Sequence, residues 1–228
     1  MKDRNIKEII EDLKDKFNEN FYTNICLIIL TVILIAAFIY VFFMIKHRLA
    51  KRYECTRDLP KNCIGLKLKG IVIKVGDGDG FRMHHQPMFN KDKIPKNNKT
   101  LSIRLAGIDA PEVRTFKRPE QKFAIESRDF LRTLILNKTV EIEVLKIDRY
   151  NRIVATVFVK NKNRKKINVS IEMVKAGLAC VFEGGCAVYG NYEKELRKTQ
   201  EIAKAQKIEI WSDPDFILPM DYKRMYAA

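Results

Sequence analysis

A stretch from Ile25 to Ile45, ICLIILTVILIAAFIYVFFMI, runs for 21 residues without a charged side chain. Because an α-helix rises about 1.5 Å per residue, this stretch is long enough to cross a hydrocarbon core of about 30 Å. No amphipathic period runs through it, which argues against a core helix, and the acids and lysines before it argue against a cleaved signal peptide. The stretch predicts a single transmembrane helix over residues 21–45, with membrane lipid as a partner.

The segments on either side of this span are polar. Residues 1–20 form an N-terminal polar segment whose apolar side chains have roughly helical spacing. Residues 46–64 are basic and contain Pro60, which is typical of a linker. Basic residues crowd the downstream flank of the span, so the orientation rule favours the cytosolic or an equivalent side for the rest of the chain.

Charge and cysteine content limit the classes of partner. The formal charge of +15 and the pI of about 9.6 favour a polyanion, either nucleic acid or an anionic membrane surface. The five cysteines are an odd number and include no C-x-x-C pair, so neither a zinc ribbon nor a dense disulfide framework is indicated.

Residues 65–213 have the pattern of one α+β domain, followed by a C-terminal tail over 214–228. Alternating, β-branched-rich stretches predict strands over 66–75, 100–108, 139–147 and 152–160. Helical spacing predicts helices over 119–136, 168–179 and 191–207. The polar residues 86–99 are predicted to form a long hairpin loop. This order favours a small antiparallel barrel with three helices packed on it over a doubly wound sheet.

Two aspartates are candidate ligands for a metal ion. Cleavage of a phosphodiester needs an activated water, positive charge on the phosphoryl oxygens and help for the leaving oxygen. Asp79 and Asp109 offer carboxylate oxygens, which hard divalent cations such as Ca²⁺ prefer, and Asp77 stands two residues from Asp79. Mg²⁺ and Mn²⁺ could use the same oxygens.

The stretch RLAGIDAPE, residues 104–112, holds the other candidates. Ala110 precedes Pro111, so its backbone is biased away from the helical region and should hold the neighbouring acids in fixed directions. Glu112 is the predicted general base. Arg104 can donate two parallel hydrogen bonds to phosphate oxygens, and Arg152, in the turn DRYNR, could supply a second donor.

Each of these motifs has a structural alternative. G-D-G-D is a common turn composition, and Arg104 with Glu112 could be a salt bridge that holds a loop. The DRYNR stretch could be only a hairpin turn. His84 and His85 might suggest a metal, but neighbouring residues of a strand point in opposite directions, so a surface position is predicted for both.

The order of these motifs resembles the thermonuclease family, the Ca²⁺-dependent staphylococcal-nuclease-like enzymes. The stretches that carry the resemblance are GIVIKVGDGDGF (70–81), IRLAGIDAPE (103–112), DRYNRIVATVFV (148–159), NVSIEMVKAGLACVF (168–182) and AKAQKIEIW (203–211). The membrane span and the enlarged loop are similar to the fungal branch, the membrane-anchored probable endonucleases of mitochondria.

The resemblance implies an OB-type five-stranded β-barrel with about three helices that hydrolyses DNA and RNA. By matching positions it makes Asp79 and Asp109 calcium ligands, with the Ala110 carbonyl as a third. It makes Glu112 the base.

By the same matching, Arg104 and Arg152 bind the phosphate and the transition state, and Tyr150 contacts the nucleotide. Two positions depart from the family pattern, with Gly80 where threonine is usual and Asn151 where glycine is preferred. The first could loosen the metal site. The second stands in a turn that could need a positive φ, which asparagine tolerates.

The leading functional hypothesis is therefore a single-pass, membrane-anchored and metal-dependent endonuclease of low sequence specificity. A second hypothesis is an OB-type module that binds nucleic acid or protein at a membrane without cutting, because fold does not determine function. A third is a tether whose positive charge serves anionic lipid. Glu112 together with two arginines favours the first, since binding alone would not require them.

Overall fold

The structure, a computed structural model, describes residues 6–89, 99–116 and 118–226. The chain divides into two units, Met1–Ala50 and Lys51–Ala228. In the first unit one helix, α1 (Ile6–Ala50), continues through both the polar segment and the predicted span. Within α1, residues Glu8–His47 include a window that is long and apolar enough to cross a membrane.

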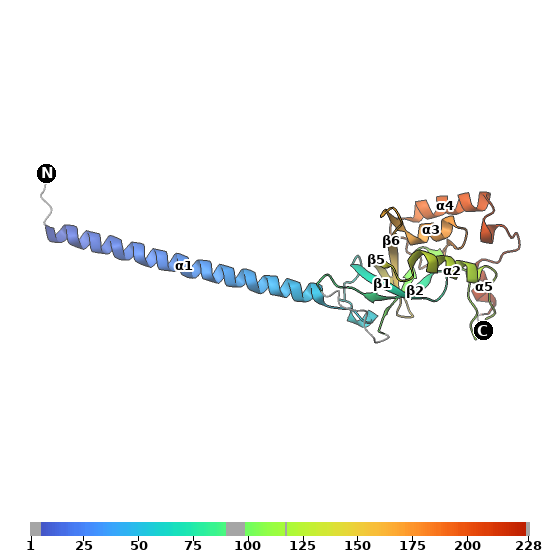
Figure 1. The fold of residues 1–228 in the computed structure, drawn as a ribbon, viewed down its shortest axis with the longest axis horizontal. Coiled ribbons are helices and arrows are strands. Elements are labelled where there is room, and N and C mark those ends of the chain that lie inside the picture. Colours follow the sequence, from blue (N-terminus) through green and yellow to red (C-terminus); the bar gives the residue numbers. More distant parts are fainter. Residues whose placement is uncertain (1–5, 90–98, 117, 227–228) are drawn as a thin grey trace. The chain divides into compact units, whose positions relative to one another are not determined.

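The second unit is built on a closed five-stranded barrel, as predicted (Figure 1). Its strands follow the order β3-β2-β1-β5-β6, and a parallel pairing of β3 with β6 closes the barrel. The five strands are β1 (Lys67–Val75), β2 (Gly80–His85), β3 (Leu101–Leu105), β5 (Thr139–Ile147) and β6 (Ile153–Lys160). A short strand, β7 (Lys166–Asn168), extends the sheet next to β6. A separate two-stranded sheet is formed by β4 (Ile108–Asp109) and β8 (Cys180–Val181).

The barrel interior is filled by the apolar half of each alternating strand. Every second side chain points inward, and most of the inward ones are aliphatic, with Phe81 and Met83 on β2. Among those exposed by 1% or less are Val72, Met83, Ile103, Ile142 and Val157. Burying each such side chain contributes about 1.5–3 kcal/mol, so the period-two pattern that predicts the strands also stabilises the closed barrel.

The three predicted helices are present and shorter than predicted. They are α2 (Ala124–Ile135), α3 (Val169–Lys175) and α4 (Glu193–Ala205). The Asn168 side chain accepts a hydrogen bond from the Ser170 amide at 3.0 Å and caps α3, and Gly177, with φ of 65°, follows its end. Figure 1 shows α3 and α4 side by side against the barrel.

A further helix, α5 (Pro219–Met225), lies in the segment predicted to be a tail. Two 3₁₀ turns complete the fold, η1 (Thr56–Asp58) and η2 (Glu209–Trp211). The predicted linker, residues 46–64, includes the end of α1, η1 and the buried Cys63. Most of the predicted hairpin loop, residues 90–98, lies outside the described residues.

The predicted surface position of the two histidines is wrong. His84 and His85 are each only 6% exposed. The His84 Nδ1 donates to the Lys99 carbonyl at 3.0 Å, while the His85 Nδ1 accepts from the Tyr53 amide at 3.1 Å and its ring stacks on Tyr53. The two rings do point to opposite sides of β2, but residues before the barrel and after the loop cover both sides.

Candidate active site

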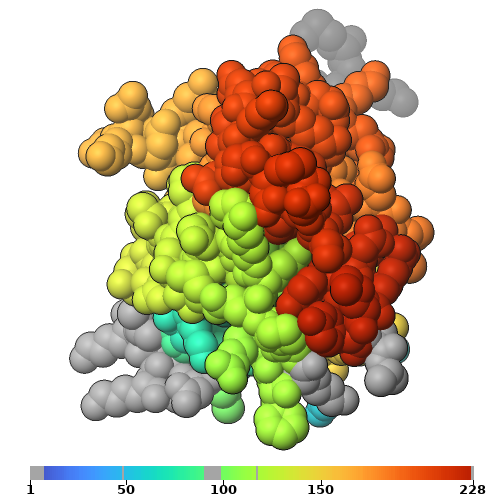
Figure 2. Space-filling view, turned by 90° about the vertical axis from the view of Figure 1, so that its right-hand side faces the viewer, coloured from blue at the N-terminus to red at the C-terminus, as the bar shows by residue number. Residues whose placement is uncertain are grey.

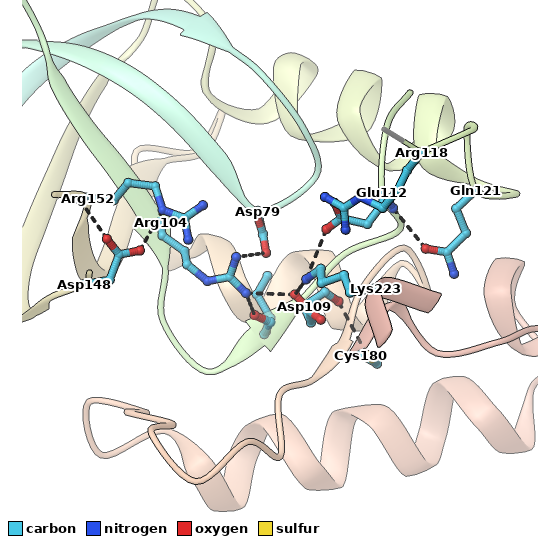
Figure 3. A network of polar contacts seen from close by, with 11 residues as sticks. Asp79, Arg104, Asp109, Glu112, Arg118, Gln121, Asp148, Arg152, Cys180 and Lys223 are labelled. Carbon is cyan, nitrogen blue, oxygen red and sulfur yellow. Dashed lines mark hydrogen bonds and ion pairs between the residues drawn. The ribbon is translucent and has the colours of Figure 1, made fainter. Parts of the chain in front are cut away.

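An inner cluster at one end of the barrel consists of Asp79, Arg104 and Asp109 (Figure 3). Both aspartates are buried, and the Arg104 side chain is 16% exposed. Arg104 lies near the end of β3, and its pairing with Gly80 on β2 places it beside Asp79 in the preceding turn. The Arg104 guanidinium contacts both acids, with Nη1 2.8 Å from Asp79 Oδ2 and Nη2 donating to Asp109 Oδ1 at 2.8 Å. One arginine thus joins two carboxylates that stand 30 positions apart in the sequence.

The G-D-G-D turn is both a structural turn and part of this cluster. The Gly80 carbonyl accepts from the Gly76 amide at 3.1 Å, and the Asp79 carbonyl accepts from the Leu105 amide at 2.8 Å. A Cβ at Gly78 would collide with the Ser127 hydroxyl and lie 2.6 Å from the Ala110 Cβ. Glycine is therefore required at this position for the turn to pack against α2 and hold Asp79 next to Asp109.

Burial sets the electrostatics of the inner cluster. Loss of water, opposed by Arg104 and reinforced by the Asp77 carboxylate, raises the pKa of Asp79 to about 6. Burial and the nearby Asp79 also raise the pKa of Asp109. The two acids in turn raise the pKa of the Arg104 guanidinium. Among the described residues, Asp109 Oδ2 has no hydrogen-bond partner although it is buried. The cluster therefore has carboxylate capacity that its own cation does not use.

Glu112, Arg118 and Lys223 form an outer cluster beside the inner one. The Glu112 carboxylate has Arg118 Nη2 3.0 Å from Oε2 and Lys223 Nζ 3.0 Å from Oε1. Lys223 also donates to Asp109 Oδ1 at 2.7 Å and so links the two clusters. The Glu112 backbone is fixed by Gln121, whose Oε1 accepts from the Glu112 amide at 3.0 Å. Figure 3 shows these side chains converging from the loop after β4 and from α5.

These contacts test the alternative that Arg104 and Glu112 form a salt bridge that holds a loop. The two are not partners of one another in the contacts of the described residues: Arg104 pairs with the aspartates, and Glu112 pairs with Arg118 and Lys223. The inner and outer clusters thus place Asp79, Arg104, Asp109 and Glu112 in one network. Glu112 and its partners are 20–30% exposed, so the network reaches the surface.

Arg152 stands beside this network at the start of β6. The turn that carries it is a hairpin turn, as its alternative predicted: the Asp148 carboxylate accepts from the amides of Tyr150 and Arg152 and from Arg152 Nε. Asn151 has φ of 59°, which confirms the predicted positive φ. The parallel register pairs Arg104 with Val154, so Arg152, two residues earlier, begins on the same face of the barrel as Arg104.

Tyr150 is 64% exposed and lies between two arginines, with Arg149 and Arg152 4.9 and 5.4 Å from its ring centre. An exposed aromatic ring beside cationic groups is suited to a nucleotide. Ala110 is buried next to Asp109. Its carbonyl as a metal ligand stays a prediction.

The donor chemistry of the inner cluster fits a hard divalent cation. Asp79 and Asp109 supply oxygen atoms, of which Asp109 Oδ2 has no hydrogen-bond partner among the described residues. Positive charge would relieve the repulsion between the two acids. In the part of the chain that the structure describes, no group of three or more His, Cys, Asp or Glu side chains is arranged to hold a metal ion. The remaining ligands would have to be backbone oxygens, water or substrate.

Besides Arg118, sequence reasoning missed Lys223 of the network. It falls in the predicted tail, within the stretch PMDYKRM. A proline at the first helical position could have indicated the short helix α5. No local pattern indicates that this helix packs beside Glu112, more than 100 residues earlier.

Comparison with known proteins agrees with this geometry. Residues 102–213 match the family model described as "Staphylococcal nuclease homologue". The probable endonuclease lcl3 of Sclerotinia sclerotiorum is 34% identical over 223 residues, covering 91% of this chain and 84% of that protein. The chain belongs to the thermonuclease family. Two other members are the probable endonuclease LCL3 of Komagataella phaffii, 36% identical over 77% of this chain and 83% of its own length, and a probable endonuclease of Schizosaccharomyces pombe, 41% identical over 68% and 74%.

The region that matches the family model does not contain every residue of the network. Arg104, Asp109, Glu112 and Arg152 lie within residues 102–213, whereas Asp79 and Lys223 lie outside them. Asp79 still enters the network through the pairing of β2 with β3. Lys223 enters it through α5, which follows the matched region.

Proposed function

We propose that this protein is a membrane-anchored, calcium-dependent endonuclease that hydrolyses phosphodiester bonds of DNA or RNA with low sequence specificity. The observation that carries the proposal is the bridge of Arg104 to Asp79 and Asp109 beside Glu112, in a chain of the thermonuclease family. The relatives are named probable endonucleases, which supports the same activity.

In this proposal Glu112 is the general base that accepts a proton from the attacking water. Asp79 and Asp109 would hold the calcium ion, with the Ala110 carbonyl as a further ligand, and a bound ion would supply positive charge for the phosphate. The same oxygens would accept Mg²⁺ or Mn²⁺. For Glu112 to accept a proton, its contacts with Arg118 and Lys223 have to loosen.

The arginines bind the phosphoryl group. Arg104 projects from a rigid strand, and its contacts with both aspartates fix the plane of its guanidinium. Arg152 uses Nε for Asp148, so the outer nitrogens of its guanidinium are not part of that ion pair. Because these donors recognise phosphate rather than base edges, the site is expected to have low sequence specificity.

Side chains around the site are suited to bind single-stranded nucleic acid. The loop after Glu112 carries Arg114 and Arg118 on either side of the fully exposed Phe116. Tyr150 stands in the hairpin turn between β5 and β6. Basic groups with exposed aromatic rings are the combination that binds single strands without base readout. The net charge of +15 agrees with a nucleic acid partner.

In this proposal the membrane anchor is α1. Its apolar window and the 21 uncharged residues from Ile25 to Ile45 support a single membrane span through residues 21–45. A mitochondrial membrane is the proposed location, and its support is the resemblance to the fungal branch of the family.

The test is a cleavage assay on the full-length chain in detergent micelles, with calcium and with a chelator. Glu112→Gln should lower the rate by about 10² or more, because it removes the base and keeps the shape of the side chain. Glu120→Gln, a change at an exposed carboxylate on the same loop, is the control and should cleave at the unchanged rate. Equal rates for Glu112→Gln and the unchanged chain would refute the mechanism. Binding of DNA without cleavage at any calcium concentration would favour the non-catalytic OB-type module.

A further inference from the structure

The ammonium of Lys223 occupies the space between the proposed metal ligand and the proposed base. Its Nζ lies 2.7 Å from Asp109 Oδ1 and 3.0 Å from Glu112 Oε1. Burial disfavours its charge, but Asp109, Asp79 and Glu112 outweigh that cost and raise the pKa of Lys223. A cationic group is therefore held by the same carboxylates that a divalent cation would use.

The segment that carries Lys223 is attached firmly to the loop that carries Glu112. Gln121 Nε2 donates to the Ile217 carbonyl at 2.6 Å, and the Tyr222 hydroxyl donates to the Pro119 carbonyl at 3.2 Å. Pro219 and Tyr222 are buried. Figure 2 shows the red C-terminal residues lying against the green surface of the preceding loop and helix. The position of Lys223 is thus built into the fold rather than left to a free tail.

Within the ion pairs of the described residues, the network is balanced in charge while Lys223 is present and no metal ion is bound. Three carboxylates (Asp79, Asp109 and Glu112) face three cationic side chains (Arg104, Arg118 and Lys223), and the Asp77 carboxylate lies near Asp79. Even with Asp77 counted, a divalent ion added to this set would leave a surplus of positive charge in a partly buried place, which is unfavourable. Withdrawal of Lys223 and binding of a phosphodiester would remove this surplus.

We propose that Lys223 is a further residue of the site, one that competes with calcium for Asp109 and Glu112 and sets the calcium concentration at which the site loads. The inference rests on the proposed function, because it takes Asp109 as a calcium ligand. It predicts that the ammonium leaves the carboxylates when calcium and the phosphate bind. A lysine that only positioned Glu112 would behave in the opposite way, since its removal would disturb the site and weaken it.

Calcium binding measured by titration calorimetry separates these roles. The full-length chain in detergent micelles is stripped with a chelator and compared with Lys223→Met, which removes the charge and keeps the length of the side chain. Arg224→Met is the matched control, because Arg224 is the next residue of α5, loses the same charge and pairs with Asp221 outside the network. Lys223→Met should bind calcium about tenfold more tightly, and Arg224→Met should stay within about twofold of the unchanged chain.

Thermal unfolding of the same proteins gives a second measurement. Without calcium, Lys223→Met should melt at a lower temperature than the unchanged chain, because Asp109 and Glu112 lose their shared cation. Calcium should then raise its melting temperature by more than it raises that of the unchanged chain. This measurement also shows whether the variant is folded.

The outcomes distinguish this inference from the proposed function. If the unchanged chain binds calcium and cleaves DNA while Lys223→Met binds calcium equally or more weakly, competition by Lys223 is wrong and the nuclease assignment stands. If neither protein binds calcium and neither cleaves, the calcium assignment fails and the inference fails with it.

Discussion

Two pairs of buried titratable side chains lie in the barrel unit, and they are treated differently. His84 and His85 on β2 have backbone partners: His84 donates to the Lys99 carbonyl and His85 accepts from the Tyr53 amide. Burial and the charge of Arg52 lower the pKa of His85 to about 4, so this ring is neutral near pH 7. Its Nδ1 has a hydrogen-bond partner in the backbone of the surrounding fold.

Asp79 and Asp109 are as deeply buried, but their partners are side chains that carry charge. Arg104 contacts both acids, Lys223 contacts Asp109, and Asp109 Oδ2 has no hydrogen-bond partner among the described residues. Backbone partners cannot leave, whereas Lys223 can exchange with another cation. The histidines are therefore buried for structure, whereas the aspartates keep the capacity to bind another cation.

The largest expected effect comes from removing the cation at the centre of the aspartate pair. Arg104→Met should lower the free energy of unfolding by about 3–5 kcal/mol without metal, because two buried carboxylates lose their shared partner. It should also lower the cleavage rate by about 10² or more. Denaturant unfolding followed by the fluorescence of Trp211, the only tryptophan, reports on the barrel unit.

Arg82→Met is the matched control for this change. Arg82 lies on the neighbouring strand β2, is exposed, and has a 3.4 Å hydrogen bond to Thr100. Its loss should leave the free energy of unfolding close to that of the unchanged chain. Equal stabilities for Arg104→Met and Arg82→Met would mean that the aspartates do not need Arg104, and the contrast with the histidines would disappear.

The difference between the two pairs also explains what could be predicted from the sequence. Asp79 follows the stretch 66–75, and Arg104 and Asp109 stand in or next to 100–108, both of which are predicted to be strands from their alternation. That these residues meet in one site is implied only by the resemblance, because the pairing of β2 with β3 that joins them has no signal in the alternation. The environment of the histidines depends on Tyr53 and Lys99, which come from stretches with no strand pattern. Lys223 depends on contacts such as Tyr222 with Pro119, which join residues 103 positions apart and leave no local periodicity.

His85 should contribute a loss of stability in acid. In the folded chain the pKa of His85 is about 4, below its ordinary value of 6.5, so the unfolded chain binds more protons between these values. The stabilising effect is therefore present above pH 6.5 and is lost as the pH falls towards 4. Its size should be about 2 kcal/mol, less than the full shift implies because the fold relaxes around a charged ring.

A variant isolates this contribution. His85→Asn keeps an acceptor for the Tyr53 amide and does not titrate, so the difference between the unfolding free energies of the unchanged chain and the variant should shrink from pH 7 to pH 4. The buried aspartates act with the opposite sign, because their raised pKa values favour the folded state at low pH, and they cancel in this difference. A difference that does not change with pH would show that His85 is not kept neutral by burial.

The smallest expected effect comes from a substitution at Gly80, in the turn that carries Asp77 and Asp79. A Cβ at Gly80 would lie 2.6 Å from Asp77 Oδ1, so Gly80→Thr, which introduces the residue usual in the family, has to displace the Asp77 carboxylate. That carboxylate is the end of a flexible side chain, and Gly80 does not have a positive φ. The free energy of unfolding should therefore change by about 1 kcal/mol or less, measured by the same Trp211 fluorescence. Because Asp77 helps to raise the pKa of Asp79, moving it away should also ease the ionisation of Asp79 and tighten calcium binding slightly. A large loss of stability would show instead that the turn has no freedom, and that the glycine is needed to fit Asp77 into the site.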